Sequence, residues 1–183
     1  MKNYVLCLIL IVSLCSCKKQ KAIAPEAVPP VNTVTAPRVE DIVPDSASLK
    51  IKVRKDSADI DETMFIFNHS STGAFAFSRD AVYFTGNGAA SVASFTTDSV
   101  ACAIQVLPYR PGAAIRLNVN AKKSGIYLLG ISYLQKIPAG IHVWLLDSAR
   151  KDSLDLRVGN YAFYVDKADS ATYGRRRFKI ILR

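Results

Sequence analysis

The sequence predicts an all-β protein, an antiparallel β-sandwich that follows a signal peptide and a proline-rich tether. From about residue 45 onward, short runs alternate apolar and polar residues with a period of two, and glycines and other turn residues separate these runs. No window carries an apolar stripe with helical spacing. The 183 residues and 50% hydrophobic composition allow one domain with a sizeable core beside its appendages.

The expected strands follow one another at short intervals. Residues 48–54 show the pattern well, because leucine, isoleucine and valine alternate with lysine and arginine. Parallel neighbours need crossover segments of a dozen or more residues, so we expect antiparallel pairing. Jelly-roll-like and immunoglobulin-like topologies both fit the pattern. The expected strands are residues 48–54, 63–69, 73–77, 81–88, 91–95, 101–108, 114–121, 125–133, 141–147, 154–158, 161–166 and 176–183.

Residues 1–16 have the features of a secretion signal. Lys2 supplies the positive start, and residues 4–14 form an apolar run interrupted only by Ser13. At a rise of about 1.5 Å per residue this run covers roughly half of a hydrocarbon core of about 30 Å. The segment therefore suits a signal peptide rather than a membrane span.

The stretch LCSC at residues 14–17 resembles the bacterial lipobox, with a leucine three residues before a cysteine and a small residue just before it. The resemblance implies cleavage before Cys17 and acylation of Cys17 with fatty acids such as palmitate. Two or more acyl chains give stable anchoring where a single chain is marginal. The alternatives fit less well, because a redox pair needs two residues between Cys15 and Cys17, and the first histidine that could join a metal site is His69.

Residues 17–44 are expected to form the tether, and residues 45–183 the folded domain. The tether lacks glycine and aromatic residues and is rich in proline, so it cannot pack a core and should be extended. Lysines that follow Cys17 would lie at the level of anionic lipid headgroups. Within the domain, Cys102 lies in an alternating apolar run and is interpreted as a buried small side chain, with a reactive thiol as the alternative.

Basic residues mark the closing strand at residues 176–183. Apolar side chains occupy its even positions, which places Arg175, Arg177 and Lys179 together on the opposite face. The strand at residues 48–54 also presents basic side chains, and if the two strands lie side by side they form one patch that attracts anionic glycan or lipid. The alternative is an ordinary solvated face whose charges discourage aggregation. Nucleic acid is not an expected partner of an exported, lipid-anchored domain.

Trp144 is a second candidate for ligand binding, as an exposed platform on which a sugar ring stacks, although a half-buried sheet residue would show the same pattern. No catalytic motif includes His69 or His142, so we expect neither an enzyme nor a cofactor. The acids of residues 59–63 could hold Ca²⁺, but they lack the spacing of an EF-hand loop and are expected to shape a turn. Glycines at residues 85–90 indicate a hairpin turn rather than a phosphate loop.

Several segments resemble a β-sandwich module of large secreted Bacteroidetes surface proteins, which often precedes a type IX secretion sorting domain. The matching segments are DETMFIFN at 61–68, GAFAFSRDA at 73–81, SGIYLLGIS at 124–132, HVWLLDSARKDSLDLRVGNYAFYV at 142–165 and the closing RRFKIILR.

This resemblance implies a non-catalytic protein of a Gram-negative cell envelope with a structural or interaction role. The alternative function is a module that binds glycan or another anionic ligand in adhesion or capture. Some lipoproteins of these bacteria reach the cell surface through acidic residues after the acylated cysteine. Here CKKQK, at 17–21, is basic. The implied location is therefore the outer membrane, with the domain facing the periplasm.

Overall fold

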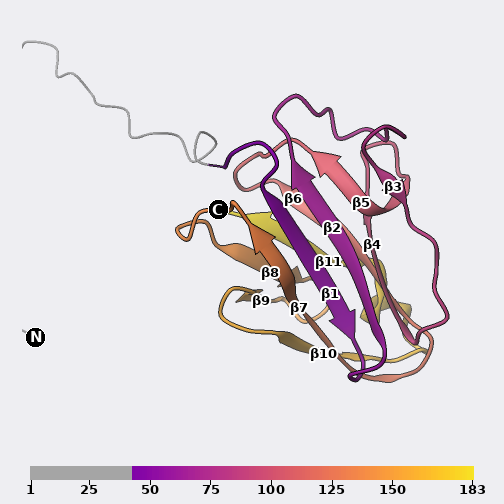
Figure 1. The fold of residues 1–183 in the computed structure, drawn as a ribbon. Coiled ribbons are helices and arrows are strands. Elements are labelled where there is room, and N and C mark those ends of the chain that lie inside the picture. Colours follow the sequence, from indigo (N-terminus) through magenta and orange to yellow (C-terminus); the bar gives the residue numbers. More distant parts are fainter. Residues whose placement is uncertain (1–42) are drawn as a thin grey trace, which may run out of the picture. The chain divides into compact units, whose positions relative to one another are not determined.

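A computed structural model describes residues 43–183, which form eleven strands and one short 3₁₀ turn (Figure 1). Within this range no helix is long and apolar enough to cross a membrane. The predicted leader, Cys17 and the tether up to residue 42 lie outside the described residues. The strands are β1 (Ser48–Arg54), β2 (Ile60–Phe67), β3 (Ala81–Val82), β4 (Ala90–Phe95), β5 (Ala101–Leu107), β6 (Ala114–Ala121), β7 (Gly125–Gln135), β8 (Val143–Asp147), β9 (Asp152–Asp155), β10 (Tyr161–Val165) and β11 (Gly174–Leu182).

All these strands belong to one hydrogen-bonded sheet in the order β10-β7-β1-β2-β5-β4-β6-β11-β8-β9, with β3 paired to β5. Every pairing is antiparallel except that of β2 with β5. The prediction of an all-β, mainly antiparallel fold is confirmed. The parallel pair was not expected, and the long connection over residues 68–100 provides the crossover that it needs.

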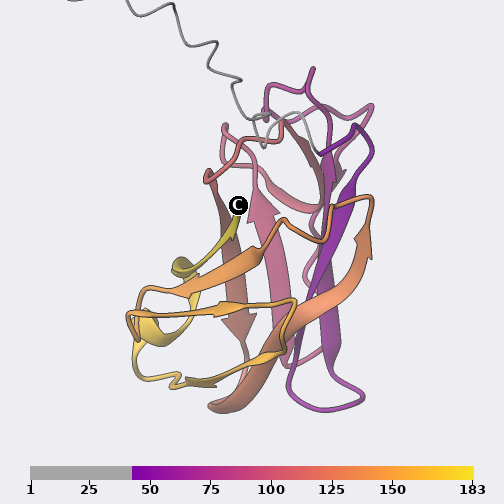
Figure 2. The same ribbon diagram turned by 90° about the vertical axis from the view of Figure 1, so that its left-hand side faces the viewer.

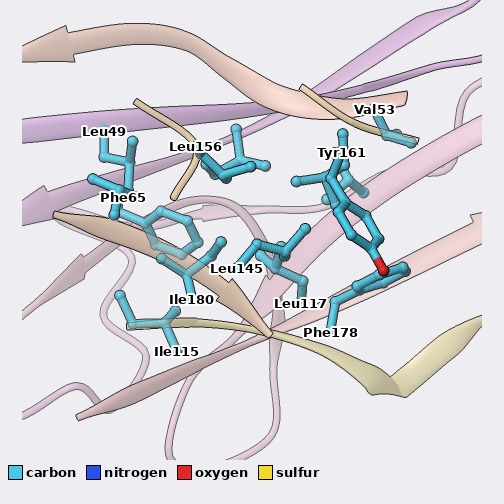
Figure 3. Close-up of a cluster of buried hydrophobic side chains, with 14 of the residues drawn as sticks. Leu49, Val53, Phe65, Ile115, Leu117, Leu145, Leu156, Tyr161, Phe178 and Ile180 are labelled. Atoms are coloured by element: carbon cyan, nitrogen blue, oxygen red, sulfur yellow. The ribbon is translucent and has the colours of Figure 1, made fainter. Parts of the chain in front are cut away.

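The sheet curls into a nearly barrel-shaped structure around its core (Figure 2). Figure 3 shows Leu49 and Phe65, from β1 and β2, close to Ile180 of β11 and Leu145 of β8. Alternation along each strand turns these apolar side chains inward, where contact with one another removes them from water. The largest fully buried side chains are Tyr127, Phe65, Phe67, Phe163, Phe178, Leu49, Ile51, Leu117, Leu129, Leu145, Ile180 and Val43.

The connection between β2 and β4 contains the main errors in the strand prediction. Residues 73–77 form no strand, and of residues 81–88 only Ala81–Val82 pair. Side-chain carboxylates take the backbone donors that a neighbouring strand would otherwise bind. Asp98 accepts from the N–H of Phe75 at 3.1 Å, and Asp80 accepts from the N–H of Ala76 at 2.7 Å. Alternating composition therefore did not produce a ladder in this segment.

Cys102 is completely buried in β5, which confirms its interpretation as a core side chain. Burial raises the pKa of its thiol to about 11, and the nearby charges of Asp80 and Asp98 act in the same direction. The thiolate, which is the reactive form, is therefore scarce at neutral pH.

Candidate functional site

The closing strand β11 does not alternate regularly along its whole length. Its register against β6 shifts between Gly174 and Phe178, so that extra residues bulge out of the ladder. Arg177 turns inward beside Phe178 and is only 3% exposed. The prediction that Arg177 shares an outer face with Arg175 and Lys179 is wrong, because it assumed an uninterrupted period of two.

Arg177 is held by partners inside the domain. Its Nε and Nη2 donate to the two carboxylate oxygens of Asp147 at 3.0 and 2.8 Å. Its Nη1 donates to the carbonyl oxygens of Tyr164, at 2.8 Å, and Thr172. The guanidinium carbon also lies 5.0 Å from the centroid of the Phe163 ring. These contacts use the donors that an external anion would need, so Arg177 has a structural role in this conformation.

Asp147 is the buried partner of this arginine. Burial raises the pKa of its carboxyl, but hydrogen bonds and charge from Arg177, with the backbone N–H groups of Arg150 and Ala149, outweigh burial and lower the pKa. Its ionised form therefore favours folding above the ordinary pKa of an aspartate, and this contribution declines as the pH falls through the lowered value. The hydroxyl of Tyr161 completes the cluster at 3.2 Å from Asp147 Oδ2.

The neighbouring outer surface carries a basic hollow of about 430 Å³, lined by Arg116, Arg175, Arg176 and Lys179. Arg116 and Lys179 are direct cross-strand partners on β6 and β11, and the bulge exposes Arg175 and Arg176. Like charges opposite each other on a sheet repel. In residues 43–183 none of the four side chains forms an ion pair. The positive charge of the basic hollow is thus uncompensated within the domain.

A second hollow, here called the β5–β6 groove, adjoins the first and has a volume of about 510 Å³. It lies where β4 ends. The final pairings of β4 are Ser94 with Leu117 of β6 and Phe95 with Ala101 of β5. Beyond Phe95, no strand of the described range lies between β5 and β6. The groove shares Arg116 and Arg175 with the basic hollow. Its lining is Thr72, Gly73, Phe95, Thr96, Thr97, Ser99, Gln105, Leu107, Pro108, Arg110, Ala113, Ala114, Ile115, Arg116 and Arg175.

Hydrogen bonds fix the rim of the groove. Bonds between Thr96 and Val100 close the turn from β4 to β5. The N–H of Thr96 donates to the carbonyl of Val100 at 3.1 Å, and the N–H of Val100 donates to Thr96 Oγ1 at 3.0 Å. The N–H of Thr97 donates to the carbonyl of Gly73 at 3.0 Å, which ties this turn to the loop after β2. Gly73 has a φ of 77°, a conformation that suits glycine.

Two side chains of the groove have unusual surroundings. The Arg175 guanidinium lies 4.5 Å from the centroid of the Phe95 ring and makes no hydrogen bond or ion pair within the described part of the chain. Gln105 is 3% exposed; its Nε2 donates to the carbonyl of Phe95 at 3.2 Å, whereas its Oε1 is buried without a hydrogen-bond partner in this range. A guanidinium with unused donors and a buried acceptor without a partner are both suited to a polar ligand.

The structure does not join the other predicted binding residues to this site. Trp144 of β8 is half-buried and lines neither hollow. Its ring centroid lies 5.4 Å from the guanidinium carbon of Arg183. The basic stripe of β1 is also separate, because β1 lies between β7 and β2 whereas β11 lies between β6 and β8. Lys50 of that stripe pairs with Glu62 at 3.3 Å. The two basic strands therefore do not form one patch.

Both histidines contact carboxylates that the sequence alone did not connect to them. His69 Nδ1 lies 2.7 Å from Asp45, and His142 Nδ1 lies 2.6 Å from Asp155. Asp155 also accepts from the backbone N–H of Val143 at 3.2 Å, which fits a role in joining β9 to β8. Among the described residues no serine or cysteine hydrogen-bonds to His142, so this pair lacks the nucleophile of a catalytic triad here.

Two of the acids at residues 59–63, Asp59 and Asp61, accept from backbone groups of another segment rather than from a turn of their own. Asp59 accepts from the N–H groups of Ala89 and Ala90, and Asp61 accepts from that of Val92 at 2.8 Å. These bonds hold the start of β2 against the start of β4. The expected turn-shaping role is filled instead by Asp56, which accepts from the N–H groups of residues 58 and 59. Within residues 43–183 no group of three or more possible metal ligands is found.

Of the residues that line the two hollows, only Arg175 and Lys179 were predicted from the sequence. Arg110, Arg116 and Gln105 come from other segments, and only the strand order brings them near β11. A single arginine within an alternating strand gives no sign of which strand lies next to it. No protein-family model, curated protein or solved structure was found to match this chain.

Proposed function

We propose that this chain is a non-catalytic, lipid-anchored protein of the bacterial cell envelope whose domain binds an anionic partner through the basic hollow. The carrying observation is the set of four cationic side chains, Arg116, Arg175, Arg176 and Lys179, gathered around one hollow without an ion pair in the described range. Uncompensated charge lowers the stability of a domain, and an anionic ligand would relieve that repulsion.

The rest of the proposal comes from the sequence. The lipobox-like segment supports acylation at Cys17, and the resemblance to the Bacteroidetes module supports an interaction role at the outer membrane. The basic segment after Cys17 supports a domain that faces the periplasm. The anionic partner would then be a glycan or an envelope protein with an acidic surface rather than nucleic acid.

We also propose that the domain is a β-sandwich, with jelly-roll-like and immunoglobulin-like topologies both retained. Support comes from contacts between strands that lie far apart in the sheet order. Phe163 of β10 packs against Phe178 of β11 with ring centroids 4.8 Å apart, and Arg150, after β8, donates to the carbonyl of Ala162 at 3.3 Å. Such contacts are typical of two facing layers.

Charge reversal tests the binding surface. The full chain, purified in detergent, is applied to a resin that carries an anionic glycan and is eluted with rising salt. Arg176→Glu combined with Lys179→Glu should elute at clearly lower salt than the wild type, because the hollow loses its attraction for the resin. Both side chains are solvent-accessible, so the variant should retain the fold.

The matched control is Lys123→Glu combined with Lys151→Glu, which changes the net charge equally at exposed positions away from both hollows. It should elute close to the wild type. If the control shifts as far as the test variant, retention depends on net charge alone and the basic hollow is not the binding surface. Failure of the wild type to bind any anionic resin would contradict the proposed function itself.

A further inference from the structure

The β5–β6 groove offers recognition that the basic hollow lacks. A ring of cations attracts every anion, whereas the groove adds an apolar wall, hydroxyl groups and a buried amide oxygen. Its volume of about 510 Å³ lies in the range of small-ligand sites. We propose that this groove is a subsite for one acidic sugar residue of an anionic saccharide. This inference rests on the proposed function and names the ligand class.

Arg175 is placed to bind the acidic group. Its guanidinium lies against the Phe95 ring, 4.5 Å from the centroid, and this contact holds the planar group while leaving its N–H donors unused within residues 43–183. A guanidinium presents a planar edge of N–H donors that matches the two oxygens of a carboxylate. Arg116 lines the same wall, and Arg110 lies at the loop between β5 and β6. The lining of the groove therefore includes three cationic side chains.

Gln105 supplies the second part of the recognition. Its Nε2 bond to the carbonyl of Phe95 fixes the amide of this groove-lining residue, and Oε1 stays buried as an acceptor without a partner in the described range. A buried acceptor without a donor is unfavourable, so a donor that reaches it is favoured. Because Oε1 is covered, a ligand hydroxyl would reach it only after neighbouring side chains of the groove move aside.

A sugar with a carboxylate combines these requirements in one ring. Its carboxylate suits Arg175 and Arg116, a hydroxyl on the ring suits Gln105, and its C–H face suits the apolar wall that Pro108 and Ala114 contribute. A simple inorganic anion satisfies the arginines but offers neither a C–H face nor the same reach toward Gln105. The groove should therefore prefer an acidic saccharide over both a neutral saccharide and free phosphate.

Calorimetry on the full chain in detergent tests this preference with three probes. These are a tetrasaccharide that alternates glucuronate with N-acetylglucosamine, its carboxyl-reduced neutral form, and inorganic phosphate. The wild type should bind the acidic tetrasaccharide at least about tenfold more tightly than either other probe. Equal affinity for the tetrasaccharide and phosphate would show a general anion site and would overturn the inference.

Two variants locate the contact. Arg175→Lys keeps the charge but loses the planar edge, and should weaken binding of the acidic tetrasaccharide about tenfold while leaving phosphate binding nearly unchanged. Gln105→Met keeps the volume but removes the acceptor, and should weaken binding several-fold. Thermal melting checks that Gln105→Met remains folded. If it unfolds, Arg175→Lys still tests the groove, because Arg175 is exposed and its replacement should not disturb the fold.

The outcomes separate this inference from the proposed function. If Arg176→Glu with Lys179→Glu reduces retention on the anionic resin but Arg175→Lys and Gln105→Met bind the tetrasaccharide like the wild type, the ligand occupies the basic hollow alone. The groove inference is then wrong while the proposed function stands. If the wild type binds neither the resin nor the tetrasaccharide, both proposals fail.

Discussion

At the scale of single residues, adjacent arginines of β11 have opposite environments. Arg176 is exposed at the basic hollow, whereas Arg177 is buried against Asp147. Adjacent residues of a strand face opposite ways, and the bulge decides that Arg177 rather than Arg176 is the buried one, although both carry the same side chain and charge. A buried ion pair is costly to break from one side, since the remaining charge keeps its desolvation penalty without its partner.

Arg177→Met should therefore destabilise the domain by about 3–5 kcal/mol, because the Asp147 carboxylate stays buried without its arginine. Urea unfolding followed by fluorescence of Trp144 measures this change. Arg176→Met is the matched control and should stay within about 0.5 kcal/mol of the wild type. Replacing both partners, as Arg177→Met with Asp147→Leu, should recover part of the loss. Equal effects of the two single arginine variants would contradict the structural role of Arg177.

At the scale of strands, side-chain carboxylates replace part of the backbone ladder between β2 and β4. Asp61 accepts from the N–H of Val92 at 2.8 Å and from the hydroxyl of Tyr83 at 2.7 Å. Burial raises the pKa of the Tyr83 hydroxyl to about 12, and the hydrogen bond to Asp61 adds to this shift. The hydroxyl therefore remains a donor at neutral pH, and one carboxylate connects β2, β4 and the residue that follows β3.

Asp61→Ala should lower the free energy of unfolding by about 1–3 kcal/mol, because the N–H of Val92 and the hydroxyl of Tyr83 both lose their acceptor. Thermal or urea unfolding provides the measurement. The adjacent Glu62→Ala is the control, because Glu62 forms a solvent-accessible pair with Lys50 and should contribute at most about 1 kcal/mol. A Glu62 variant that costs as much as the Asp61 variant would refute the bridging role of Asp61.

Strand prediction succeeded where the apolar face is buried and failed where side chains took over the backbone bonds. The alternation in residues 48–54 and 114–121 matches β1 and β6 at both ends. The segment at 73–77 alternates large with small apolar residues but lies in a loop held by Asp80 and Asp98. The amino-acid composition of a segment indicates its preference for the extended conformation. Whether the segment joins a sheet depends on a partner strand that can bind its backbone.

At the scale of the whole molecule, the proposed function depends on how the domain is attached to the envelope. Cys17→Ala should move the protein from the membrane fraction to the soluble fraction, because it removes the predicted site of acylation. Its leader should also remain uncut by the lipoprotein peptidase. Fractionation followed by mass spectrometry of the N-terminal peptide measures both effects. Ser16→Ala keeps a small residue before the cysteine and should behave like the wild type. A Cys17→Ala variant that stays in membranes would contradict the anchor.

Part of this protein follows from the sequence by itself. The period-two pattern determined the all-β class, the burial of Cys102, and the inward side chains Phe178, Ile180 and Leu182, since alternation and burial are local properties of a strand. The tertiary structure decided which strands became neighbours. It separated the basic residues of β1 from those of β11, buried Arg177 through a bulge, and brought Gln105 and Arg116 to one groove. Strand order and bulges result from packing across the whole sheet, and a short window of sequence does not contain that information.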